Sequence, residues 1–317
     1  RADRAFARSA VASPTQRADR PFQISHYEIN ERWQELAVVL EGREIGSVYD
    51  PRIHDTANPY RSPEELADEL EKLAHLEHVL ALMYLYARYS VLQPEEVTVA
   101  DSWPTLKEDV YFVRREILIT AVSEMQHMRW VNQLLWELAE AGLIKRRPPV
   151  VEPGREIPGA GPLSTRPAEL MPLLPAVLKT FVDVELPSGY IDGRYARVVA
   201  TLRSGYPSSL YQLASRIVTD GEEHYSRFRR VQQTLNRYGK YTPYLRDIEL
   251  GSPADPNVAT ALAIYAKIKS SLRAAYESGD LEQAADVVRA RELMHKLDEA
   301  AEALARKGVG VPFFPQK

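Results

Sequence analysis

Hydrophobic residues recur at helical spacing along most of the chain from Ser62 onward. The segment 62–90 begins with Ser62 followed by Pro63, which are typical of a helix N-cap and a first helical position. A second apolar pattern runs from about 106 to 141 and stops at Gly142, a residue that favours helix C-termini. The spacing therefore predicts two long helices over these two segments.

Prolines dominate the part of the chain that follows. Eight prolines fall within 28 residues: Pro148, Pro149, Pro153, Pro158, Pro162, Pro167, Pro172 and Pro175. No helix interior tolerates that density, so we expect a long crossover connection. A third helix is predicted over about 168–185, ending before Pro187, with its regular part confined to the second half by the last two of those prolines.

After turn signals between 188 and 207, a fourth helix is predicted over 208–238. A fifth and a sixth, about 255–277 and 280–307, are separated by Ser278-Gly279-Asp280. Residues 24–50 fit either a short helix or a hairpin around Glu41-Gly42. The chain is therefore predicted to be almost entirely helical.

The order of these helices indicates a fold. Four long helices come as two pairs joined by one long crossover, which is the connectivity of ferritin-like four-helix bundles. We expect an all-α protein with an N-terminal arm over 1–61, the bundle over 62–240, and a C-terminal helical hairpin over 241–317 packed on the bundle.

Ionisable residues interrupt the apolar stripes at core positions of all four bundle helices. They are Glu77, Glu124, His127, Glu185, Asp220 and His224. Burying one ionised carboxylate costs several kcal/mol, so these groups need a common compensating charge. Dinuclear carboxylate bundles take one Glu from each of two helices and a Glu-x-x-His from each of the other two. Glu77 and Glu185 match the single ligands, and Glu124 with His127 matches one Glu-x-x-His pair.

The fourth helix departs from this pattern, because Gly221 stands three residues before His224. Two alternatives remain for its carboxylate ligand. Asp220 lies four residues before His224 on the same face, whereas Glu223 lies about 100° around the helix. Geometry favours Asp220. Its side chain is one methylene shorter than that of glutamate, so the metal held by His224 is expected to be the more weakly bound of the two.

Other candidate residues receive simpler interpretations. Tyr84 lies two turns from Glu77 on the same helix face and is a candidate catalytic residue, for redox chemistry or proton donation. The remaining histidines are expected to be ordinary hydrogen-bonded residues: His26, His54, His75, His78 and His295.

Composition and charge narrow the chemistry. The 317 residues include no cysteine, which excludes thiolate metal sites, iron–sulfur ligation and a cysteine nucleophile. Metal ligands must then be His, Asp and Glu, a set that suits two iron ions, with manganese or zinc as alternatives. The net charge of −4 gives no reason to expect nucleic acid as a partner. No apolar run is long enough to span a membrane, and the first residues lack the apolar core of a secretion signal, so we expect a cytoplasmic protein.

Two long segments resemble a known family. HLEHVLALMYLYARYSVL and ILITAVSEMQHMRWVNQLLWELAEAG are similar to paired helices of iminophenyl-pyruvate dimer synthases, the violacein and chromopyrrolate-type biosynthetic enzymes. FVDVELP around Glu185, IVTDGEEHYSRF around His224 and the terminal GVPFFP resemble further parts of that family, with Asp220 where a Glu is usual. The resemblance covers about 65–317 and implies oxidative chemistry on amino-acid-derived imines in secondary metabolism.

The leading functional hypothesis is a di-iron oxidoreductase that uses O₂ or peroxide on a small-molecule substrate, as a monomer or homodimer. Oxygen-rich ligation with one imidazole per metal leaves coordination positions open for O₂. The alternatives are a ferritin-like metal-storage or peroxide-protection protein, and a metal-free interaction bundle. The extra hairpin and the long proline-rich loop favour the enzyme, because they could cover a substrate cavity.

Overall fold

The structure is a computed structural model that describes residues 58–98, 102–159, 164–186, 190–203, 205–279 and 284–316. Expectations for the first 57 residues lie outside the described residues. These are most of the N-terminal arm, the helix-or-hairpin alternative for 24–50, His26 and His54.

The described part of the chain is predominantly helical, which confirms the predicted all-α class. The helices are α4 (Pro63–Tyr89), α5 (Leu106–Glu140), α6 (Pro175–Val184), α7 (Tyr190–Leu202), α8 (Ser208–Asn236), α9 (Pro256–Ser278) and α10 (Ala285–Ala305), with a 3₁₀ turn η2 (Pro94–Glu96). Strands β1 (Glu156–Pro158) and β2 (Thr165–Pro167) form an antiparallel hairpin, and β3 (Glu249–Leu250) pairs in parallel with β4 (Val309–Gly310).

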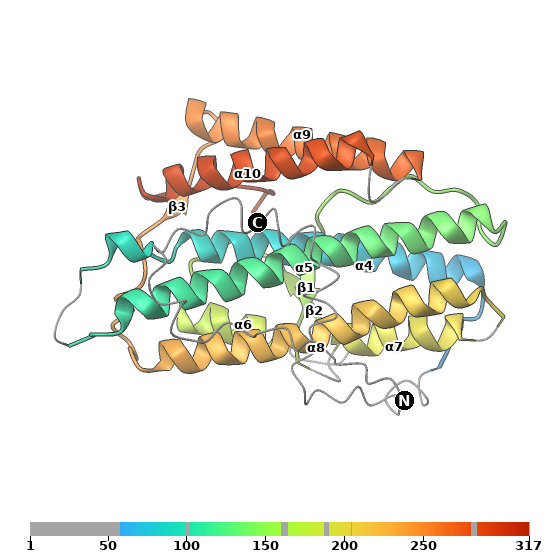
Figure 1. Ribbon diagram of the computed structural model, residues 1–317, viewed down its shortest axis with the longest axis horizontal. Helices are drawn as coiled ribbons and strands as arrows, with labels where there is room; N and C mark the ends of the chain where they lie inside the picture. The colour runs from blue at the N-terminus through green and yellow to red at the C-terminus, as the bar shows by residue number, and fades with distance from the viewer. Residues whose placement is uncertain are drawn as a thin grey trace, which may run out of the picture.

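The helices form three layers (Figure 1). α4 and α5 pack against each other in the middle layer. α8 lies on one side of them together with α6 and α7, which follow one another along it. α9 and α10 lie side by side on the other side, in contact with α5 and α4 respectively. α4, α5, α8 and the α6–α7 pair are thus the four members of the bundle.

Local sequence explains where the central helices begin and end. The side chain of Ser62 accepts a hydrogen bond from the Glu65 N–H at 3.1 Å, and Pro63 follows it, as predicted. At the end of α5, Gly142 adopts φ of +70°, a left-handed conformation that costs glycine little. Both long helices therefore have nearly the predicted bounds.

The third member of the bundle is formed by two helices. The first, α6, begins at Pro175 and ends at Val184, so its regular part lies in the second half of the predicted segment, as the prolines predicted. Glu185 is its C-cap residue, with φ of −88° and ψ of 7°. A further helix, α7, follows at Tyr190–Leu202, where we had expected only turns. A second helix follows the turn signals after Glu185 because the apolar pattern resumes beyond them.

A buried charge cluster attaches the C-terminal hairpin to the middle layer. We define it as the buried guanidinium groups of Arg88, Arg114 and Arg246 with the buried carboxylate of Glu302 and the half-buried one of Asp298. The exposed Glu96 also pairs with Arg246. Glu302 of α10 is central, since its two oxygens lie 2.6 Å from Arg114 Nη2 and 2.6 Å from Arg246 Nη2. Asp298 lies 2.7 Å from Arg88 Nη1. Burial favours the neutral acid, but the three guanidinium groups outweigh it and lower the pKa of Glu302 to about 2.

Strand β4 makes an unusually close approach to α4. Gly310 lies against the ring of Tyr86, and a β-carbon at position 310 would overlap that ring and its hydroxyl. Gly310 also accepts a hydrogen bond from the Gly251 N–H at 2.8 Å through its carbonyl. The β3–β4 pair is therefore seated directly on α4.

None of the described helices is long and apolar enough to cross a membrane.

Candidate metal centre

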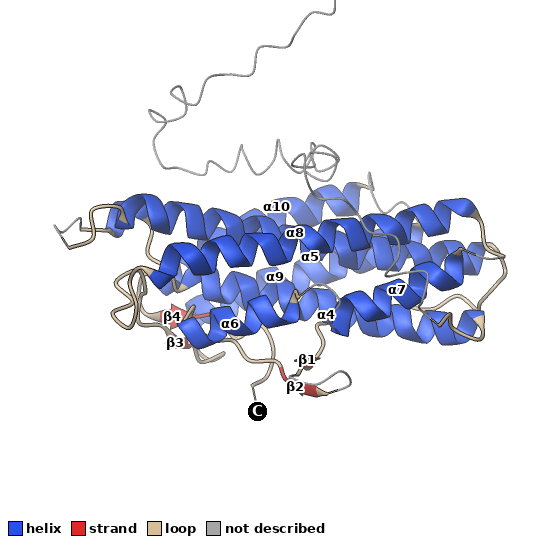
Figure 2. Cartoon of the chain, turned by 90° about the horizontal axis from the view of Figure 1, so that it is seen from below, coloured by secondary structure: helices blue, strands red, loops and turns tan. Residues whose placement is uncertain are grey.

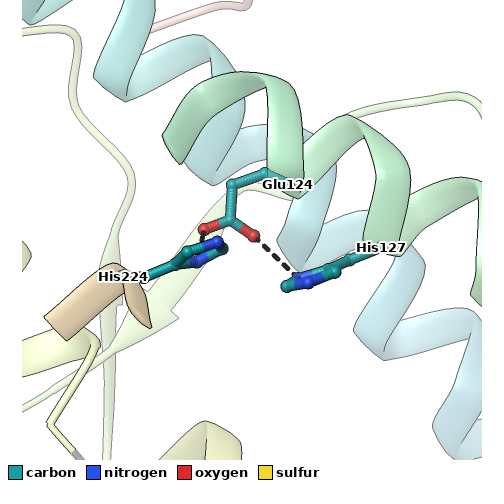
Figure 3. Close-up of side chains that lie close together, drawn as sticks. All are labelled: Glu124, His127 and His224. Carbon is teal, nitrogen blue, oxygen red and sulfur yellow. Dashed lines mark ion pairs between the residues drawn. The ribbon is translucent and has the colours of Figure 1, made fainter. Parts of the chain in front are cut away.

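Glu124, His127 and His224 meet in the interior of the bundle (Figure 3). Glu124 and His127 come from successive turns of α5, and His224 comes from α8 across the bundle. Each offers one possible ligand atom, and the three atoms lie within 4.8 Å of one another. The carboxylate of Glu124 lies between the two rings, with Oε1 at 2.9 Å from His224 Nδ1 and Oε2 at 3.4 Å from His127 Nδ1.

The other three residues singled out in the sequence surround this group. Asp220 Oδ2 lies 2.7 Å from His127 Nε2 and 3.6 Å from His224 Nε2, so it contacts both imidazoles. Glu77 Oε2 lies 3.6 Å from His127 Nδ1, and Glu185 Oε2 lies 3.8 Å from His224 Nδ1. The structure thus brings all six predicted residues to one centre. Whether they hold metal stays a prediction.

Two tyrosine hydroxyls donate hydrogen bonds to the outer carboxylates. Tyr84 donates to Glu185 Oε1, and Tyr195 of α7 donates to Glu77 Oε1. Tyr84 is completely buried, and its ring packs edge-on against Phe181 and Phe228 at 4.7 and 4.8 Å between centroids. Burial and the neighbouring carboxylates raise the pKa of both hydroxyls well above the usual range, so both are protonated donors at neutral pH.

Tyr195 was missed in the sequence because α7 was not predicted. The signal was present, since Ile191, Tyr195, Val198 and Leu202 recur at intervals of four and three residues. A helix predicted from that spacing would have placed Tyr195 in the same core as Glu185.

The carboxylates and imidazoles of the centre shift one another's pKa values. Burial disfavours the charged imidazoles, yet hydrogen bonds and ion pairs with the carboxylates outweigh burial and raise the pKa of His127 and His224 well above the usual range. The same contacts lower the pKa of Asp220 and Glu124 against the opposing effect of burial. Glu77 behaves differently, because burial and the adjacent Glu124 charge raise its pKa to about 7. Without a metal, protonated imidazoles supply the positive charge.

The residues present fit a pair of divalent cations. Four carboxylates carry four negative charges, which two divalent ions balance with both histidines neutral. Two buried polar atoms at the centre lack a well-directed hydrogen bond among the described residues. They are Glu124 Oε1, which His224 Nδ1 approaches as an ion pair, and His224 Nε2, which has only Asp220 Oδ2 at 3.6 Å. A buried polar atom without a partner is costly, and a bound ion would satisfy both atoms.

Glu223, the alternative ligand of the fourth helix, lies outside this group. Its carboxylate is 3.1 Å from Arg227 Nη2, one turn further along α8, and its side chain is half-buried. The geometry therefore favours Asp220 as the carboxylate of α8.

The remaining described histidines do not join the centre. His78 is buried with Nε2 3.1 Å from the Tyr265 hydroxyl, and burial lowers its pKa to about 3. His75 Nδ1 donates to the Glu152 carbonyl at 2.7 Å. His295 is half-buried on α10. These positions agree with the simple interpretation given to them from the sequence.

Comparison with known proteins gives two findings. The sequence model of the ferritin-like family matches residues 70–301. The chain is also similar to a ferritin-like protein from Caulobacter vibrioides, with a TM-score of 0.55 and 18% identity, over 81% of this chain and 99% of that one. That likeness bears on the fold alone. No curated protein matches the chain. Neither finding tests the resemblance to imine-dimer synthases, which stays a prediction.

Proposed function

Because this chain belongs to the ferritin-like family, we propose that its buried centre binds two transition-metal ions, preferably iron, and that the protein is a metal-dependent oxidoreductase. The observation that carries the proposal is the convergence of four carboxylates and two imidazoles from α4, α5, α6 and α8 on one buried point. Such a set of ligands suits iron, manganese or zinc.

Each residue has a definite place in this proposal. Glu124 stands between the two imidazoles and would bridge or chelate the ions, and His127 and His224 would each hold one of them. Glu77, Glu185 and Asp220 complete the sites. Bound iron would supply redox chemistry with O₂ or peroxide. Tyr84 and Tyr195 hold the outer carboxylates Glu185 and Glu77 in place, and Tyr84 is the candidate proton donor to a reacting group.

The substrate class follows from sequence resemblance. The similarity of the SEMQHM helix to imine-dimer synthases supports oxidation of a small amino-acid-derived molecule in a cytoplasmic biosynthetic pathway. The α9–α10 layer covers one side of the middle helices, which distinguishes this chain from a minimal four-helix storage bundle. A monomer or dimer supports the enzyme, and assembly into a large shell would instead indicate storage.

The first test is metal content. Protein purified without chelators is expected to hold up to two transition-metal ions per chain, and removing them should lower the melting temperature, because the ions bind the folded state. Elemental analysis and thermal melts before and after chelation measure both effects. Metal-replete protein with no bound iron, manganese or zinc and an unchanged melt would contradict the proposal.

A second prediction concerns the short carboxylate of α8. Asp220→Glu lengthens the side chain by one methylene and is expected to raise occupancy of the ion held by His224, which should be the weaker site in the native protein. Anomalous scattering from crystals of both proteins measures the two occupancies. Equal occupancies in the native protein would count against a weak site, and Asp220→Asn is the control that should lower occupancy.

A further inference from the structure

A cleft of about 420 Å³ lies on the outer side of α4, away from the interior of the metal centre. One wall is the face of α4 that carries Lys72 and Leu76, and the opposite wall is the β1–β2 hairpin with the loop before it. Arg194 of α7 also lines the cleft. Figure 2 shows the hairpin beneath α4, between α6 and α7. The volume is that of an ordinary small-molecule site.

The charges that line the cleft are mostly positive. Lys72, Arg155 and Arg194 are set against the single carboxylate of Glu156, although the whole chain has a net charge of −4. The Glu156 carboxylate accepts a hydrogen bond from Thr165 Oγ1 at 2.8 Å. The cleft is therefore a local region of positive charge on an acidic protein.

The cations differ in how far the protein already pairs them. Arg194 forms an ion pair with Glu69, and Lys72 Nζ lies 3.6 Å from the same carboxylate. Arg155 is exposed and forms no hydrogen bond or ion pair through its side chain within the part of the chain that the structure describes. Its guanidinium has a planar set of donors that suits a carboxylate.

The cleft is already formed by tight packing of the loop on α4. The Gly154 N–H donates to the His75 carbonyl at 2.7 Å, and a β-carbon on Gly154 would lie only 3.0 Å from that oxygen. The His75 ring donates from Nδ1 to the Glu152 carbonyl at 2.7 Å, which leaves Nε2 available to a ligand. A ligand would therefore meet a preformed site.

The rest of the lining is apolar. Leu76 and Ile157 are buried at 4% and 2% exposure, and Pro153 and Pro158 lie beside them. From the cationic residues and this apolar lining, we propose that the cleft binds a small organic carboxylate with an apolar body. The carboxylate would pair with Arg155, and the apolar body would lie against Leu76 and Ile157.

Residues of the cleft are adjacent in the sequence to residues of the metal centre, but ligand binding in the cleft does not require the metal. Leu76 precedes Glu77, and Arg194 precedes Tyr195, whose hydroxyl donates to Glu77. Two residues that line the cleft are thus neighbours in the sequence of Glu77 and of the tyrosine that donates to it. Because no lining residue is a proposed metal ligand, binding should persist without metal.

Titration calorimetry with phenylacetate tests the proposal on the protein as purified. We expect saturable binding, weaker binding of acetate and of 2-phenylethanol, and loss of roughly tenfold or more in phenylacetate affinity in Arg155→Gln. The matched control is Arg166→Gln, an exposed arginine on β2 that does not line the cleft, which should leave affinity unchanged. Glu124→Gln, expected to lose metal, should still bind phenylacetate.

Several results would overturn the proposal. Absence of saturable phenylacetate binding would do so, as would equal effects of Arg155→Gln and Arg166→Gln. Inorganic phosphate that binds as tightly as phenylacetate would indicate a simple anion site with no role for the apolar lining. Loss of phenylacetate binding in Glu124→Gln would place the ligand at the metal centre. Metal content, measured separately on each protein, decides the proposed function independently.

Discussion

Replacing Glu124 by glutamine is expected to empty most of the metal centre while the helices persist. Glutamine has nearly the same volume and can still form hydrogen bonds, but it removes the charge between the two imidazoles. Loss of residues that only orient metal ligands lowers affinity about 10- to 100-fold, so loss of a bridging ligand should exceed about 100-fold. Elemental analysis with circular dichroism of Glu124→Gln separates metal loss from unfolding.

Glu223→Gln is the matched control for that experiment. Its carboxylate pairs with Arg227 outside the centre, and a partly exposed ion pair contributes at most about 1 kcal/mol to stability. Metal content should therefore stay near the native value. If Glu223→Gln empties the site and Asp220→Asn does not, Glu223 is the ligand of α8. Equal and small effects of Glu124→Gln and Glu223→Gln would instead favour the metal-free interaction bundle.

Glu302→Gln is expected to cost about 3 kcal/mol in the free energy of unfolding. The substitution leaves two buried guanidinium groups, on Arg114 and Arg246, without the carboxylate that they share. Urea unfolding monitored by circular dichroism measures this loss. Glu292→Gln, on an exposed face of the same helix, is the control and should change stability by less than about 0.5 kcal/mol.

The same carboxylate predicts a pH dependence. The folded protein lowers the pKa of Glu302 from 4.5 to about 2, so its stabilising effect is present above pH 4.5 and is lost as the pH falls toward 2. Glu302→Gln should therefore lose less stability than the native protein over that interval. Parallel curves for the two proteins would show that the charge of Glu302 does not stabilise the fold.

The long central helices were predictable because each carries a complete local signal. Ser62 and Pro63 begin α4, Gly142 ends α5, and apolar spacing fixes which faces are buried. The third member of the bundle was predicted only in part: α6 was expected and α7 was missed, because these helices have only 10 and 13 residues. Short segments show few periods of the pattern, and turn residues between them look like the end of a helix.

The centre was predicted residue by residue because a charge at a core position contradicts the apolar stripe around it. That contradiction identifies Glu77, Glu124 and His224 without any structure. Tyr195 contradicts nothing, since a tyrosine at a core position is ordinary packing. Its role is apparent only from the distance between its hydroxyl and Glu77. The buried charge cluster was missed for a related reason, because Arg114 and Glu302 are 188 positions apart in the sequence.

The contact between Gly310 and Tyr86 constrains how the sequence can vary among homologues. A larger residue at 310 would collide with the tyrosine ring, so it can be tolerated only where position 86 carries a smaller side chain. The two positions should therefore change together in homologues, although they lie in α4 and in the last strand. An alignment deep enough to measure covariation would show whether α4 and β4 stay in contact across the family.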